Sequence, residues 1–180
     1  MKKANILIVE DENIVAKDIQ HTLEKIGYNV IGICSNGEKA LVFTKKKAPD
    51  LILMDIMLKG KITGIETAIK INKERNIPII YLTAYADKDT LAKAKITQPQ
   101  GYIIKPFKEV DIRTSVEVAL YKHKKEEKIK NERDLYYSII KNDGKNVDGS
   151  IFVKSKYQLV KVKTRDIYFI EALKDYVKIN

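Results

Sequence analysis

Carboxylate, hydroxyl and amine side chains follow four short apolar runs in the first part of the chain. Glu10 and Asp11 follow NILIV, Asp55 follows LILM, Thr83 ends IPIIYLT, and Lys105 follows GYII. Carboxylates that lie close together repel one another, and a hard divalent cation such as Mg²⁺ relieves that repulsion. A carboxylate can also attack phosphorus and form an aspartyl phosphate, while a metal ion, a lysine and a hydroxyl stabilise the transferring group. These residue types suit phosphoryl transfer if the fold brings them together.

The elements that must position these residues alternate between apolar runs and amphipathic stretches. We predict strands at 5–10, 28–34, 51–54, 77–84 and 101–106, and helices at 14–27, 37–49, 64–75, 87–97 and from 107 to beyond 121. The strands are almost continuously apolar, which is typical of a parallel sheet buried on both faces. Five such units predict an α/β fold, a doubly wound five-stranded parallel sheet.

Ligands of such sheets bind outside the carboxyl ends of the strands, where all five polar residues are expected. Asp55 ends a buried strand, and a buried charge needs a partner. We expect Lys105, together with a cation held by the acids, to stabilise it. Mg²⁺ takes few protein oxygens besides waters and phosphate, which suits Glu10, Asp11, Asp55 and one loop carbonyl better than a calcium cage would.

Four segments, in this order, resemble the receiver domain of bacterial and archaeal two-component response regulators: VEDE (9–12), DLILMDIM (50–57), YLTAYA (81–86) and GYIIKPF (101–107). The resemblance implies a flavodoxin-like fold and a phosphoacceptor that catalyses only its own phosphorylation and dephosphorylation, not an enzyme with a separate substrate. A haloacid-dehalogenase-like phosphatase also uses Asp, Thr and Lys, but its nucleophile lies in an Asp-x-Asp motif near the start of the chain. Here Asp55 lies in DIM, which disfavours that alternative.

The resemblance also implies residue roles at the metal site. Asp55 would accept a phosphoryl group from a cognate histidine kinase. Mg²⁺ would bind Glu10, Asp11, Asp55 and the backbone carbonyl of Met57, with no other cofactor. The loop IMLKGKITG departs from the commoner pattern, because it is one residue longer and Lys59 stands where proline is usual. Magnesium binding is still expected.

Switching residues follow from the same resemblance. Thr83 would be the switch hydroxyl, Lys105 the partner of the phosphoryl group, and Tyr102 the aromatic residue that rotates on activation. Pro106 would follow a cis peptide bond. Receivers of this family commonly form homodimers on phosphorylation, so a homodimer is expected.

The rest of the chain predicts a linker and a short β-rich segment. Residues 122–149 are charged and end in a turn-rich stretch, and strands are predicted at 151–153, 158–162, 167–171 and 176–179. The runs IFVK, LVKVKTRDIYFIEA and DYVKI resemble the opening of a LytTR-type DNA-binding domain. The predicted organisation is a receiver at 1–121, a helical linker at 122–149 and an incomplete LytTR-like segment at 150–180.

Composition limits the class of protein. The chain has 180 residues, 44% of them hydrophobic and 32% charged, which indicates a folded chain. It has no apolar run of the roughly 18 residues that span a bilayer, and its single cysteine excludes an internal disulfide. We therefore expect a cytoplasmic protein without a membrane partner.

Two functions remain open. Residues 121–180 carry 15 basic and 9 acidic side chains, a balance compatible with DNA. The first hypothesis is a phosphorylation-controlled transcriptional regulator, which binds DNA in a full-length form. The alternative is a signalling receiver without DNA output, acting through protein partners or onward phosphotransfer.

Overall fold

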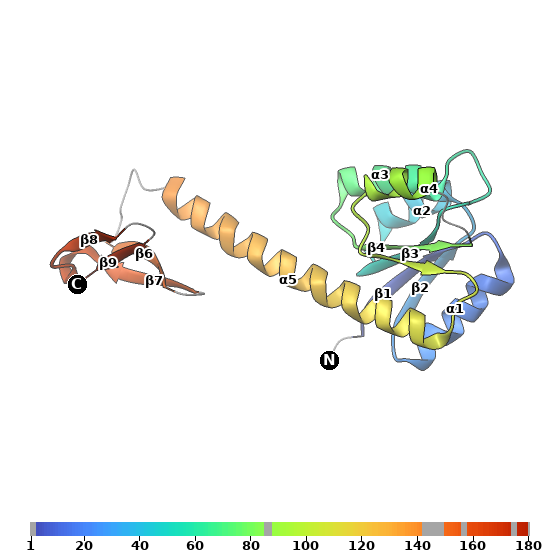
Figure 1. Cartoon of the computed structure of the whole chain (residues 1–180), viewed down its shortest axis with the longest axis horizontal. Helices are drawn as coiled ribbons and strands as arrows, with labels where there is room; N and C mark the ends of the chain where they lie inside the picture. Colours follow the sequence, from blue (N-terminus) through green and yellow to red (C-terminus); the bar gives the residue numbers. More distant parts are fainter. Residues whose placement is uncertain (1–2, 85–87, 142–149, 156–157, 174–175, 180) are drawn as a thin grey trace. The chain divides into compact units, whose positions relative to one another are not determined.

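The computed structural model describes residues 3–84, 88–141, 150–155, 158–173 and 176–179 (Figure 1). The chain divides into two compact units, residues 1–125 and 126–180, and each is described by itself. Within the described ranges, no helix combines the length and the apolar composition that crossing a lipid bilayer requires.

The first unit is built on one five-stranded parallel sheet with the strand order β2-β1-β3-β4-β5. The strands are β1 (Asn5–Val9), β2 (Asn29–Cys34), β3 (Leu51–Asp55), β4 (Ile79–Thr83) and β5 (Gly101–Ile104). The helices are α1 (Asn13–Lys25), α2 (Gly37–Lys46), α3 (Gly64–Glu74), α4 (Lys88–Lys95) and α5 (Glu109–Lys141), of which the part up to Lys125 belongs to this unit. The predicted doubly wound, flavodoxin-like α/β fold is confirmed.

Helices cover both faces of the sheet, which explains why its strands are continuously apolar (Figure 1). Successive strand residues point to opposite faces. Leu7 and Val9 pack in one core with buried residues of α2, α3 and α4, whereas Ile6 and Ile8 pack in the other with residues of α1 and α5. Every residue of β3 and of β4 is buried. Polar groups of these two strands therefore reach a ligand only at the strand ends.

Helix α3 begins with a capping box at the end of the loop that follows β3. The Thr63 hydroxyl accepts a hydrogen bond from the backbone N–H of Glu66 at 3.2 Å, and the Glu66 carboxylate accepts one from the N–H of Thr63 at 2.7 Å. The next residue, Gly64, donates its N–H to the carbonyl of Ile56 at 3.0 Å. These bonds fix the path of the chain on both sides of the loop.

The C-terminal end of α4 is tied to two other elements through Thr97. The Thr97 hydroxyl donates to the carbonyl of Ala94 at 2.7 Å and lies 2.9 Å from the Tyr81 hydroxyl. Because the hydroxyl of Thr97 has only one proton, Tyr81 is the donor in the second bond. Asn72 of α3 donates its side-chain amide to the Thr97 carbonyl at 3.0 Å. The predicted cis peptide is also present, between Lys105 and Pro106.

The second unit contains two antiparallel hairpins. Strand β6 (Ser150–Ser155) pairs with β7 (Gln158–Lys163), and β8 (Ile170–Leu173) pairs with β9 (Tyr176–Ile179). Residues Thr164–Asp166 form a 3₁₀ turn, closed by a bond from the Ile167 N–H to the Thr164 carbonyl at 3.2 Å. Strand β8 therefore begins later than the strand predicted at 167–171.

Candidate functional site

The register of the sheet brings four strand ends to one edge. Val9 pairs with Met54, Asp55 with Leu82, and Thr83 with Ile104. The residues that end or follow these strands are therefore neighbours in space although they are far apart in the sequence. They are the polar residues that the sequence singled out: Glu10, Asp11, Asp55, Thr83 and Lys105.

Three carboxylates meet at this edge. Glu10, Asp11 and Asp55 each place one carboxylate oxygen so that the three atoms lie within 4.8 Å of one another. Glu10 is fully buried and Asp55 is 6% exposed, so water screens their mutual repulsion poorly. Oxygen-only donors at this separation suit a hard divalent cation, and the residues present fit Mg²⁺.

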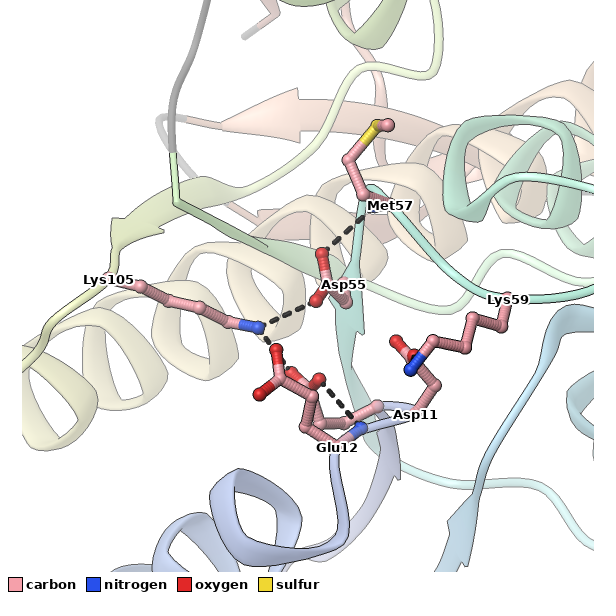
Figure 2. Close-up of polar contacts among 7 residues, drawn as sticks. Asp11, Glu12, Asp55, Met57, Lys59 and Lys105 are labelled. Atoms are coloured by element: carbon pink, nitrogen blue, oxygen red, sulfur yellow. Dashed lines mark hydrogen bonds and ion pairs between the residues drawn. The ribbon is translucent and has the colours of Figure 1, made fainter.

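Lys105 is the cation that the fold itself supplies to two of these acids (Figure 2). Its Nζ atom lies 2.6 Å from Glu10 Oε2 and 2.6 Å from Asp55 Oδ2. Burial raises the pKa of Glu10, the nearby charge of Asp55 raises it further, and the hydrogen bond from Lys105 opposes both. Burial alone would lower the pKa of Lys105, but its bonds to Asp55 and Glu10 outweigh that effect and raise it.

Backbone N–H groups hold the two buried carboxylates in place. The N–H of Met57 donates to Asp55 Oδ1 at 2.9 Å, and the N–H of Glu12 donates to Glu10 Oε1 at 3.2 Å. In each of these acids, one carboxylate oxygen accepts a backbone hydrogen bond and the other contacts Lys105. The side chain of Met57 is 72% exposed, so Met57 acts on Asp55 through its backbone.

Thr83 and Tyr102 lie on the neighbouring strands β4 and β5. Thr83 is buried at the end of β4, and its carbonyl accepts a bond from the N–H of Lys105 at 2.7 Å. The Tyr102 ring lies 5.9 Å from the ring of Tyr81, tilted by 33°. The Tyr102 hydroxyl is buried, has no hydrogen-bond partner in the part of the chain that the structure describes, and burial raises its pKa. The role of Tyr102 as a switch residue stays a prediction.

One contact was missed at the sequence level. Lys59 Nζ lies 3.0 Å from Asp11 Oδ2, and Figure 2 shows Lys59 approaching Asp11 from the side opposite Lys105 in that view. This hydrogen bond raises the pKa of Lys59. The available signal was a lysine in the place of the usual proline, four residues after Asp55.

The sequence model of the family described as the response regulator receiver domain matches residues 6–117. The transcriptional regulatory protein PdtaR of Mycobacterium tuberculosis is 31% identical over 115 residues, which are 64% of this chain and 56% of PdtaR. The phyllosphere-induced regulator PhyR of Methylorubrum extorquens is 32% identical over 117 residues, which are 64% of this chain and 43% of PhyR. The chain thus spans about half the length of the curated relatives it matches.

Solved structures give the same result for the fold. The signal receiver domain of a modulated diguanylate cyclase from Desulfovibrio desulfuricans superposes with a TM-score of 0.67 at 38% identity, covering 69% of this chain and 99% of that domain. The N-terminal domain of a response regulator/sensory box/GGDEF protein from Carboxydothermus hydrogenoformans has a TM-score of 0.63 at 36% identity, covering 68% of this chain and 98% of that domain. The family match ends at residue 117, so the LytTR resemblance of residues 150–180 stays a prediction.

Proposed function

This chain belongs to the response regulator receiver family, and from that premise we propose that it accepts a phosphoryl group on Asp55 from a histidine kinase. The observation that carries this proposal is the environment of Asp55. Its carboxylate ends a buried strand, contacts Lys105 at 2.6 Å and shares the strand edge with Glu10 and Asp11. The chain would meet such a kinase in the cytoplasm, in a two-component phosphorelay.

The proposed transfer needs a nucleophile and charge neutralisation. The Asp55 carboxylate attacks the phosphorus of a phosphohistidine, a P–O bond forms, and the P–N bond breaks. The departing ring nitrogen keeps the electron pair of that bond and takes up a proton from water, so the histidine leaves as neutral imidazole. Lys105, already 2.6 Å from Asp55 Oδ2, neutralises part of the charge on the phosphoryl oxygens. The chain then acts as a regulatory phosphoacceptor, whose only catalysis is of its own phosphorylation and dephosphorylation.

Glu10, Asp11, Asp55 and the Met57 carbonyl are the proposed ligands of Mg²⁺. A bound Mg²⁺ would supply positive charge to the phosphoryl oxygens and to the acids around Asp55. The close approach of the three carboxylates, within 4.8 Å, supports this assignment.

The proposed switch begins at Thr83 and Tyr102. Phosphorylation adds about two negative charges at Asp55. The Thr83 hydroxyl would turn to bond the phosphoryl group, and Tyr102 would repack in the adjacent space. The surface formed by α4, β5 and α5 would then change, and we propose that it favours a homodimer.

For the output we propose DNA binding through a LytTR-like domain that begins in residues 150–180. The excess of basic residues after residue 120 and the two hairpins of the second unit support it. PdtaR and PhyR are also named as regulators, PdtaR as a transcriptional one. The alternative is output through protein partners or onward phosphotransfer. It is supported by the similarity to receivers of a modulated diguanylate cyclase and a sensory box protein.

Phosphorylation by a small acyl phosphate tests the core of the proposal. Incubation with acetyl phosphate and Mg²⁺ should add one phosphoryl group, detected by intact-protein mass spectrometry, and Asp55→Asn should abolish the addition. Asp18→Asn, which removes an exposed carboxylate of α1, is the matched control and should be labelled like the wild type. Labelling that persists in Asp55→Asn would refute the proposal.

A further inference from the structure

The ion pair between Lys59 and Asp11 joins a solvent-exposed cation to a nearly buried anion. The Lys59 side chain is 84% exposed, whereas the Asp11 side chain is 9% exposed, and Lys59 Nζ lies 3.0 Å from Asp11 Oδ2 (Figure 2). A lysine so exposed could extend into water at little cost. It instead turns toward the acid cluster, where negative charge is concentrated.

The loop that carries Lys59 is held by the N-terminal turn of α2. Glu38 Oε1 accepts a hydrogen bond from the backbone N–H of Lys61 at 2.9 Å. Gly60 has a φ of +143°, a conformation that favours glycine, and a Cβ atom there would lie 3.0 Å from Glu38 Oε2. The backbone on the C-terminal side of Lys59 is therefore fixed, which keeps its side chain within reach of Asp11.

The two lysines divide the acid cluster between them. Lys105 contacts Glu10 and Asp55, and Lys59 contacts Asp11. In this arrangement each of the three carboxylates has an ammonium partner. A divalent cation bound to Asp11 would lie close to the ammonium group of Lys59. Both are positively charged, so they would repel each other.

We propose that Lys59 is an internal competitor of the metal ion. Its ammonium group occupies Asp11 in the metal-free protein and is displaced when a divalent cation binds, so Lys59 lowers the affinity of the site for Mg²⁺. This inference rests on the proposed metal site. In it, Lys59 does not bind the metal ion but sets how tightly the site binds it. Exposed ion pairs shift an equilibrium by about two- to five-fold, which sets the size of the expected effect.

Magnesium titrations of Lys59 variants test the inference. The wild type, Lys59→Gln, Lys59→Arg and Lys61→Gln would each be titrated with MgCl₂ and followed by the ¹⁵N–¹H shifts of the Asp11 and Met57 amides. Lys59→Gln should bind Mg²⁺ about two- to five-fold more tightly than the wild type. Lys59→Arg, which keeps the charge, should bind like the wild type.

Lys61→Gln is the matched control, because it removes the same charge two residues away and leaves the backbone bond to Glu38 in place. It should change the dissociation constant less than Lys59→Gln does. Equal dissociation constants for Lys59→Gln and Lys61→Gln, or weaker binding by Lys59→Gln, would overturn the inference alone. Absence of saturable Mg²⁺ binding in all four proteins would instead refute the proposed metal site.

Discussion

A Cβ atom added to Gly64 would lie 1.9 Å from the carbonyl oxygen of Asp55. The first residue of α3 therefore packs directly against the backbone of the proposed phosphoacceptor. No flexible side chain stands between them, so a larger residue must displace either the helix or the end of β3.

Gly64→Ala is expected to destabilise the first unit and to slow phosphorylation. Overpacking of this kind costs about 1–3 kcal/mol, and the clash is with backbone. Urea unfolding and the rate of labelling by acetyl phosphate would measure the two effects. Gly101→Ala is the control, because a Cβ there meets nothing within 4 Å, and its stability should stay within about 0.5 kcal/mol of the wild type. A Gly64→Ala protein with wild-type stability would contradict the packing argument.

Lys105→Met is expected to leave Glu10 and Asp55 without their shared cation. Breaking a buried ion pair costs about 3–5 kcal/mol, and the 14% exposure of Lys105 places this site near the lower end of that range. Without Lys105, the negative charge of Glu10 and Asp55 is no longer neutralised by the protein and attracts Mg²⁺ more strongly. Mg²⁺ should therefore raise the urea midpoint of Lys105→Met more than that of the wild type. Lys108→Met, at an exposed position, should respond to Mg²⁺ like the wild type. Equal responses of the two variants would count against this role of Lys105.

The capping box of α3 predicts a pH dependence of stability. Bonds to the backbone and hydroxyl of Thr63 hold the pKa of Glu66 below its ordinary value of 4.5. A lowered pKa in the folded state gives stability that is present above pH 4.5 and is lost as the pH falls through the folded-state pKa. Glu66→Gln keeps a hydrogen-bonding side chain but does not titrate, so the difference in stability between it and the wild type should change in the acid range. Identical acid profiles would contradict the assignment.

Tyr81 predicts a second pH dependence, at the alkaline end. Burial, with a smaller contribution from Tyr102, raises its pKa to about 12 from 10.0, although the bond with Thr97 opposes the rise. The stability that results is present below pH 10 and is lost as the pH rises through about 12. Tyr81→Phe should reduce this alkaline loss and should cost about 1 kcal/mol at neutral pH through the lost bond to Thr97. Tyr168→Phe, at a side chain that is 90% exposed, should change neither quantity in the same urea titrations.

The sheet could be predicted because its physical cause is local. Continuous apolar runs such as 51–54 indicate burial on both faces, and strand ends in a parallel sheet share one edge, which placed Asp55 near Lys105. Helix ends were less accurate. The helix predicted to 49 ends at Lys46, because Lys47 is already extended two residues before Pro49.

Contacts that depend on loop conformation could not be predicted. Lys59, which pairs with Asp11, lies in a loop where Gly60 has a positive φ and the Lys61 N–H bonds to Glu38. That bond joins residues 23 positions apart, so a local sequence pattern does not reveal the conformation of the loop. The continuous apolar run 77–84 likewise indicates that Tyr81 is buried, but it does not identify the partner of the Tyr81 hydroxyl, which lies 16 residues further along the chain.

The attachment of Thr97 constrains how α4 can move. Tyr81 and Asn72 hold the residue just beyond the C-terminal end of that helix, whereas Thr83 lies on the N-terminal side of it. A rearrangement that starts at Thr83 would therefore make the helix pivot about a fixed point, with a displacement that grows toward Lys88. A small movement of the Thr83 hydroxyl would then cause a larger displacement at the N-terminal end of α4, while the C-terminal end of the helix would move little.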